Sequence, residues 1–204
     1  MTHGRLHGLV DGIFAIVMTL LVLELKVPAL AVKNNHALWH ALAQEGSIFI
    51  SYLMSFILLY IYWRAHNFII SNLAKSLDMT LINLNMLFLV LIGLVPFSTH
   101  LLGSYPNLQL AIIIYAFNII LIGLSVFSMR LYIDRSEAIE SERRARPQLI
   151  NAFIRMLTPV VCGTLAILIS FSSTRLAFAV LLVGVLFNLP NNSADNFRKV
   201  FRIQ

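Results

Sequence analysis

An acidic residue, Asp11, stands at the start of a long uncharged stretch, and a basic residue, Arg5, precedes it by six positions. No charged residue occurs from Gly12 to Leu23. A carboxylate at the edge of an apolar helix of membrane length is costly unless it is paired or hydrated. Asp11 is therefore a candidate for a functional or structurally obligatory site, and Arg5 is a candidate partner.

Other residues offer little chemistry. The sequence contains neither G-x-S-x-G nor H-E-x-x-H, two common catalytic signatures, so we expect no enzyme. His36 and His40 are four residues apart and could share a helix face as metal ligands. Because no third acidic or thiol ligand lies nearby, we expect a solvated pair with no bound metal and no cofactor. Cys162 is the single cysteine, which excludes a disulfide framework.

The composition indicates a protein that faces lipid. Apolar residues make up 59% of the 204 residues and charged residues 12%, which is about half of the roughly 25% found in soluble domains. The mean hydropathy is +0.83. A pI near 9.8 would suit nucleic acid binding. The positions of the basic residues indicate membrane topology instead, and we expect no nucleic acid partner.

Six segments are apolar enough to predict transmembrane helices of about 20 residues. They cover residues 6–26, 47–63, 79–102, 108–132, 150–170 and 175–190. We predict an all-α integral membrane protein with a single domain over residues 1–204. A short interfacial helix with Trp39 as its aromatic anchor is expected from His36 to Glu45. The charged stretch from Asp134 to Pro147, with an EAIESERRAR core, is expected to form an exposed helix.

The basic residues also predict the orientation of these segments. Eleven lysines and arginines fall on one side of the predicted membrane and three on the other. The larger set is Arg5, Arg64, Lys75, Arg130, Arg135, Arg143, Arg144, Arg146, Arg198, Lys199 and Arg202, and the smaller set is Lys26, Lys33 and Arg175. The positive-inside rule then predicts a multi-pass protein of the cell membrane with both termini in the cytoplasm. The first apolar run has no small-residue cleavage site, so we expect it to stay in the membrane.

The first segment carries a stripe of side chains along one face. At about 100° per residue, the stripe comprises Ile16, Thr19, Leu20 and Leu23. Asp11 lies mostly away from it and should be buried against neighbouring helices if the stripe faces an axis. Three glycines spaced four residues apart, Gly4, Gly8 and Gly12, equally suit close helix packing. The residues alone therefore leave open whether this face lines a pore or packs against a helix.

The run from Arg5 through Asp11 to Pro28 resembles the first-helix signature of the transmembrane-protein-175 family, the lysosomal potassium channels and their prokaryotic relatives. In that signature an arginine is followed by three variable residues and then Phe-Ser-Asp. Arg5 and Asp11 match in spacing, whereas Leu9 and Val10 replace Phe-Ser and remove a hydroxyl near Asp11. Two further stretches, 62–67 and 83–99, are similar to the family's Trp-x-x-His segment and third helix.

The resemblance implies a homotetramer in which four first helices surround a central pore. Such a pore is narrowed by apolar rings, which map to Ile16, Leu20 and Leu23, with a threonine layer at Thr19. Partly dehydrated K⁺ would pass better than Na⁺ because K⁺ loses water at lower cost. A polar network at the cytoplasmic end is expected to comprise Arg5, Asp11, Trp63 and His66.

The expected function is thus a modestly potassium-selective cation channel whose partners are K⁺ ions, the lipid bilayer and three further copies of the chain. One alternative is a proton-coupled transporter with Asp11 and His66 as its relay. Carriers usually show paired repeats, and the sequence shows none. A non-conducting membrane scaffold is the other alternative. No T-V-G-Y-G motif occurs, so a carbonyl filter of that type is absent.

Overall fold

The computed structural model describes residues 2–30, 33–72, 74, 76–136 and 146–188. These residues form eight α-helices, which confirms the predicted all-α class. The helices are α1 (His3–Val22), α2 (Asn35–Gln44), α3 (Gly46–Asn72), α4 (Met79–Gly93), α5 (Val95–Ser104), α6 (Gln109–Arg135), α7 (Arg146–Ser170) and α8 (Thr174–Phe187).

The described helices include four stretches long and apolar enough to cross a membrane: His3–Val22, Gly46–Ser71, Met79–Ser104 and Gln109–Arg135. They coincide with the first four predicted segments. Two shorter apolar helices, Leu157–Ser170 and Thr174–Phe187, occupy the positions of the last two. The chain is therefore a multi-pass membrane protein, and a crossing by all six segments stays a prediction.

The helix bounds differ from the predicted segments where polarity or proline intervenes. α3 continues to Asn72 although the predicted segment stops at residue 63, because the polar residues that follow still favour a helical backbone. The third segment is divided at Leu94, and Pro96 occupies the first turn of α5, where its missing N–H is tolerated. The predicted helix at 36–45 is α2, capped by the Asn34 side chain. The charged stretch at 137–145 and the basic tail at 189–204 lie outside the described residues.

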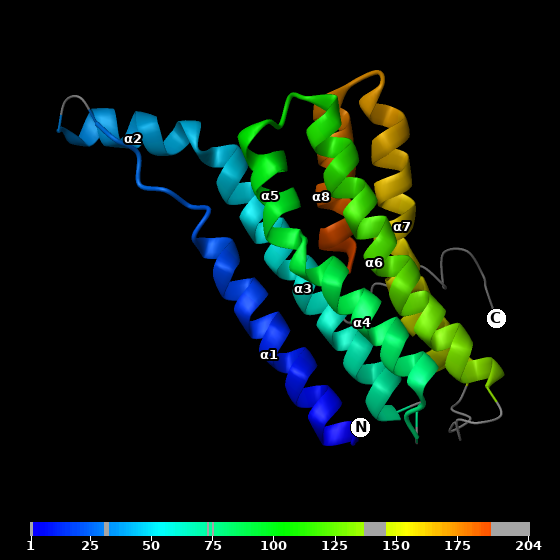
Figure 1. Cartoon of the computed structure of the whole chain (residues 1–204). Coiled ribbons are helices and arrows are strands. Elements are labelled where there is room, and N and C mark those ends of the chain that lie inside the picture. Colours follow the sequence, from blue (N-terminus) through cyan, green and yellow to red (C-terminus); the bar gives the residue numbers. More distant parts are fainter. Residues whose placement is uncertain (1, 31–32, 73, 75, 137–145, 189–204) are drawn as a thin grey trace.

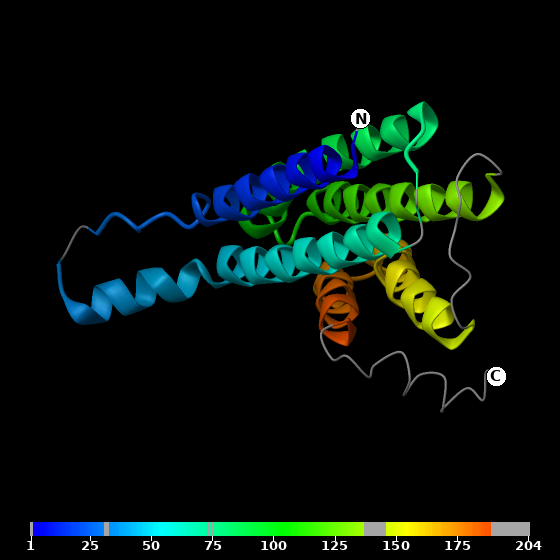
Figure 2. The same ribbon diagram turned by 90° about the horizontal axis from the view of Figure 1, so that it is seen from below.

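Helices α3 and α6 form the centre of the bundle (Figure 1). Seen from below, α1 lies on one side of them, and α7 and α8 lie on the opposite side (Figure 2). α1 packs on α3, α4 and α5, while α7 and α8 pack mainly on α6 and on each other. α2 projects away from the bundle and has no buried residue. α1 is thus a peripheral helix with one side open.

Buried hydrogen bonds connect the helices on which α1 packs. The Thr99 hydroxyl donates to Ser55 Oγ at 2.7 Å, and Ser55 Oγ lies 2.9 Å from the Tyr115 hydroxyl. The Asn118 side chain donates from Nδ2 to the carbonyl of Leu91 at 3.1 Å. Such bonds inside membrane proteins contribute about 0.6 kcal/mol each on average. Together they join α3, α4, α5 and α6 into a firm support for α1.

The close crossing of α3 and α5 yields a testable prediction. A Cβ atom at Gly103 would lie 2.9 Å from the Cα atom of Ile48, and the Ser47 hydroxyl donates to the Gly103 carbonyl at 2.8 Å. Gly103→Ala should therefore push the helices apart and destabilise the protein by about 1–3 kcal/mol. Thermal unfolding in detergent measures this. Gly93→Ala is the matched control, because nothing lies within 4 Å of its Cβ position. Equal Tm values in both variants would contradict the prediction.

Candidate pore helix

One face of α1 is buried against the bundle. Its buried residues are Leu6, Val10, Phe14, Val17 and Leu21. They recur every three or four positions, which is the spacing of one helical face. The Phe14 ring lies 5.8 Å from the ring of Phe88 on α4. This face accounts for the packing of α1 within its own chain.

The predicted stripe occupies a different face, and that face has no partner in the single chain. The side chains of Ile16, Leu20 and Leu23 are 59%, 43% and 67% exposed. Thr19 is exposed as well. In an assembly or a membrane, the stripe could therefore contact lipid, pack against a second copy of the chain or line a pore.

Thr19 places an oxygen on this exposed face. Its hydroxyl donates a hydrogen bond to the carbonyl of Ile16 at 2.8 Å. The bond fixes the rotamer of the side chain and uses its only proton. The lone pairs of the Thr19 oxygen therefore remain available to a passing cation.

The three glycines of α1 leave open space beside the stripe. A Cβ atom at Gly4, Gly8 or Gly12 would meet no atom within 4 Å. The packing of α1 within its own chain therefore does not require glycine at these positions. Close approach of another helix is the usual reason for small residues at this spacing in membrane proteins.

Asp11 is hydrogen-bonded to α3 at the edge of the buried face. The indole of Trp63 donates from Nε1 to Asp11 Oδ1 at 2.8 Å. Asp11 is exposed in the single chain, because α1 buries the side that carries Val10 and Phe14 and leaves Asp11 at the margin. Its burial against neighbouring helices, expected if the stripe faces an axis, stays a prediction. The bond nevertheless gives the carboxylate a specific partner.

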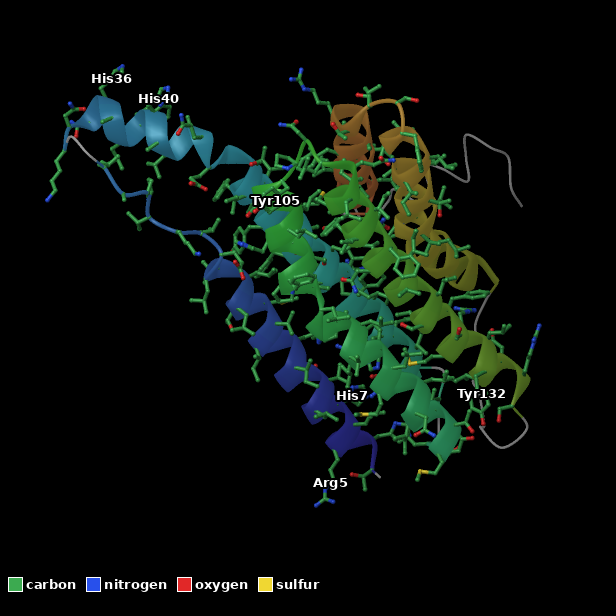
Figure 3. All side chains as sticks on the ribbon, turned by 45° about the horizontal axis from the view of Figure 1, so that its top comes forward. Arg5, His7, His36, His40, Tyr105 and Tyr132 are labelled. Carbon is green, nitrogen blue, oxygen red and sulfur yellow. The ribbon has the colours of Figure 1, made fainter. Side chains whose placement is uncertain are left out.

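Among the described residues, the other members of the predicted polar network are not hydrogen-bonded or ion-paired to Asp11. The Nε2 atom of His66 is 2.7 Å from Asn85 Oδ1, and its ring stacks on Phe88 at 5.1 Å. Among the described residues no ion pair joins Arg5 to Asp11. The Arg5 side chain points away from the bundle (Figure 3). The single chain therefore joins Asp11 to Trp63 by a hydrogen bond, and neither Arg5 nor His66 takes part in that bond.

A second polar contact lies just beyond the end of this helix and was not predicted from the sequence. Glu24 follows the end of α1, and its Oε2 atom lies 2.6 Å from Nδ1 of His100 on α5. A histidine inside an apolar segment is itself a signal, as is the first acidic residue after an uncharged helix. Their pairing could not be found from the sequence because 76 positions separate them.

Known proteins resemble this chain in sequence and in fold. Residues 5–96 match the model of the family described as endosomal/lysosomal potassium channel TMEM175. A potassium channel of Chryseobacterium is 26% identical over 98% of this chain and 99% of its own length. The crystal structure of a lysosomal potassium-selective channel TMEM175 homolog from Chamaesiphon minutus matches with a TM-score of 0.76 and 27% identity, over 91% of this chain and 95% of that one.

The chain is similar to the TMEM175 family in both sequence and fold. A potassium channel of Streptomyces collinus is 37% identical over 50% of this chain, and the alignment spans 48% of that relative's length. The region matched by the TMEM175 model runs from α1 to the first turn of α5. It includes the stripe of α1 and the Asp11–Trp63 pair, and it stops before His100.

Proposed function

We propose that the protein is a cation channel that conducts K⁺ in preference to Na⁺, with four copies arranged around a central pore lined by α1. The open stripe of α1 carries this proposal, because it lies off the face that packs on the bundle. A peripheral helix with one packed face and one unpartnered face is suited to line a space shared between copies. The bacterial relatives are named potassium channels, which supports the same function.

The chemistry of the stripe determines what such a pore would do. Rings of Ile16, Leu20 and Leu23 from four copies form apolar constrictions that resist wetting. An ion must lose part of its hydration shell to pass, and the smaller Na⁺ ion holds its water more strongly than K⁺. The Thr19 layer supplies oxygen atoms between these rings. The preference for K⁺ then arises from the cost of dehydration rather than from backbone carbonyls.

In the proposed orientation the protein spans the cell membrane, and both of its termini lie on the cytoplasmic side. Arg5 and Tyr132 lie at one end of the bundle, and His36, His40 and Tyr105 lie at the other (Figure 3). The excess of basic residues at the Arg5 end supports a cytoplasmic location for that end. α2, on which Trp39 is exposed, then lies at the non-cytoplasmic surface of the cell membrane. The proposed partners are K⁺ ions, lipid and identical chains, with no cofactor.

Flux measurements in liposomes test the function. The purified protein should carry K⁺ several times faster than Na⁺ under a clamped potential, and empty liposomes provide the control. Proton flux is measured in the same preparation. K⁺ movement that occurs only together with protons would favour the carrier alternative, and no movement of either ion would favour the scaffold.

Mass measurement in detergent or native lipid tests the assembly within the same proposal. The particle should contain four copies of the 23.0 kDa chain, because one chain with a single candidate pore helix cannot surround a pore. A stable monomer that still conducts would contradict the four-fold arrangement.

A further inference from the structure

One segment projects from the bundle and has little support within its own chain. It consists of α2 and of residues 23–30 and 33–34, which lie between α1 and α2, and we call it the outer arm. Figures 1 and 2 both show it extending past the bundle, away from α7 and α8. α2 has ten residues and none is buried, whereas isolated helices shorter than about 12–15 residues are marginal in water. The arm therefore needs a surface that the single chain does not supply.

An apolar groove of about 660 Å³ lies at the base of the outer arm, where α2 meets α3. Leu25 and Val27 line it from the segment after α1, and Leu42 and Phe49 line it from α2 and α3. Val27 is 90% exposed, and Leu42 and Phe49 are 49% and 50% exposed. Apolar side chains gathered on an exposed surface in this way mark a site of interaction.

The charges of the groove distinguish between a lipid chain and a protein segment as its occupant. Glu45 lines the groove, and in the part of the chain that the structure describes no ion pair joins it to Lys26 or to any other residue. An acyl chain would remove water from this carboxylate without offering it a partner, and an anionic head group would repel it. A protein segment that carries both a cation and an apolar side chain suits the groove better.

The far end of the same arm has this chemistry. Lys33 is exposed and directly precedes Asn34, the N-cap residue of α2. Leu38 lies one turn into α2 and is 37% exposed. The ten residues of α2 lie between Lys33 and Glu45 and span about 15 Å, so these two side chains do not pair within one chain. A second copy of the chain can bring them together.

We propose that the outer arms of neighbouring copies dock head to tail, with Lys33 and Leu38 of one arm against Glu45 and the groove of the next. The inference rests on the proposed function, because it adds a contact to the same four-fold assembly. Arm tip and groove are different surfaces, so the contact is heterologous, and heterologous contacts form a ring when the rotation between copies closes. Around a pore lined by α1, a quarter turn sets each tip against the side of the next arm.

The two parts of this contact have different roles. Exposed ion pairs contribute little to affinity, so the apolar side chains in the groove supply most of it. The pairing of Lys33 with Glu45 fixes which surfaces meet, since a tip against a tip or a groove against a groove would bring like charges together.

Cross-linking tests the contact directly. Lys33→Cys and Glu45→Cys are combined in one chain, and the protein in liposomes is treated with a short bis-maleimide, which joins two thiols. The double variant should give products of two, three and four copies on a denaturing gel, at least fivefold more than either single variant. The native Cys162 is present in every variant, so the single variants measure its background.

The same gel distinguishes other arrangements of the arms. Arg175→Cys combined with Glu45→Cys is the matched control, because Arg175 is exposed at the start of α8, and it should give only the background. Strong cross-linking of Lys33→Cys alone would show that tips meet tips. Products that stop at two copies would show a closed pair. Either result, or a double variant at the background level, would overturn the head-to-tail ring.

Charge reversal tests the pairing. Lys33→Glu and Glu45→Lys each place like charges at the contact, so each should reduce the assembled fraction of diluted protein at least threefold at low ionic strength. The double variant restores opposite charges and should assemble like the unchanged protein. Arg175→Glu should have no effect. Normal assembly of both single variants, or a double variant that assembles no better than either, would overturn the proposal and favour lipid as the partner of the arm.

These measurements separate the arm contact from conduction. Cross-linked products of four copies in liposomes that carry no K⁺ flux would refute the proposed function and leave the contact between arms in place. K⁺ flux from a double cysteine variant that gives only background cross-linking would overturn the arm contact and leave the channel in place.

Discussion

Replacing Ile16 with asparagine should bring the K⁺ to Na⁺ permeability ratio close to one while total conductance holds or rises. Ile16 lies on the open face of α1 at 59% exposure, five residues after Asp11. In the proposed tetramer, four isoleucines would form a collar with no groups to replace lost water ligands. Four asparagine amides supply such groups, and Na⁺ gains more than K⁺ because its shell is the costlier one to remove. Single-channel recording of the reversal potential, with K⁺ on one side and Na⁺ on the other, measures the change.

A residue on another face of α1 provides the control for Ile16→Asn. Val22 is 47% exposed but lies about 120° away from Ile16 at 100° per residue. Val22→Asn should therefore leave the reversal potential unchanged. Asparagine at Leu20 or Leu23 should mainly ease opening, since both lie on the stripe further along the helix. An unchanged reversal potential in Ile16→Asn would remove Ile16 from the selectivity mechanism and leave the Thr19 layer as the better candidate.

The sequence predicted the helices well because hydropathy over 20 residues is a strong local signal. It identified all six apolar segments and the short helix α2. The ends of helices were less predictable. α3 extends nine residues beyond the apolar segment because Arg64 and His66 are polar but compatible with a helix. Apolarity indicates where lipid lies, whereas helix ends depend on capping and on proline.

The site was predictable where it depends on helical periodicity. The stripe of Ile16, Leu20 and Leu23 follows from a 100° step, and the structure leaves that same face open. Which polar groups meet across helices was not predictable. His66 binds Asn85 rather than joining Asp11, and Glu24 binds His100. These pairings depend on the rotation of each helix about its axis, and a nearly uniform apolar helix carries little sequence information about that rotation.

Breaking the hydrogen bond between Trp63 and Asp11 should reduce the yield of assembled protein about tenfold. An indole N–H bound to a carboxylate is a charge-assisted bond, and its loss is worth about 1.5–3 kcal/mol. Trp63→Phe keeps the aromatic ring and removes the donor. Asp11→Leu removes the acceptor, and Asp11→Asn keeps an acceptor without the charge, so its effect should be intermediate. Size-exclusion chromatography of the extracted protein measures the yield of the assembled form.

The only other tryptophan supplies the control. Trp39 is 76% exposed on α2, so Trp39→Phe should leave the yield unchanged. If the bond acts as described, Trp63→Phe combined with Asp11→Leu should be no worse than the more damaging single change. Additive losses would show that the two residues act separately. Normal assembly of Asp11→Asn with loss of proton-linked flux alone would favour the transporter alternative.

Arg5→Ala decides whether Asp11 has a further partner in the assembly. Within one chain Arg5 points away from the bundle and forms no ion pair with Asp11, so a partner role would require a neighbouring copy. If the pair forms only between copies, Arg5→Ala should reduce assembly as strongly as Asp11→Leu while the monomer keeps its Tm. If Arg5 serves only orientation at the cytoplasmic surface, assembly should stay normal. In that second case Trp63 is the partner that stabilises the Asp11 carboxylate. The spacing from Arg5 to Asp11 then follows from the orientation of α1 in the membrane and not from a contact between the two residues.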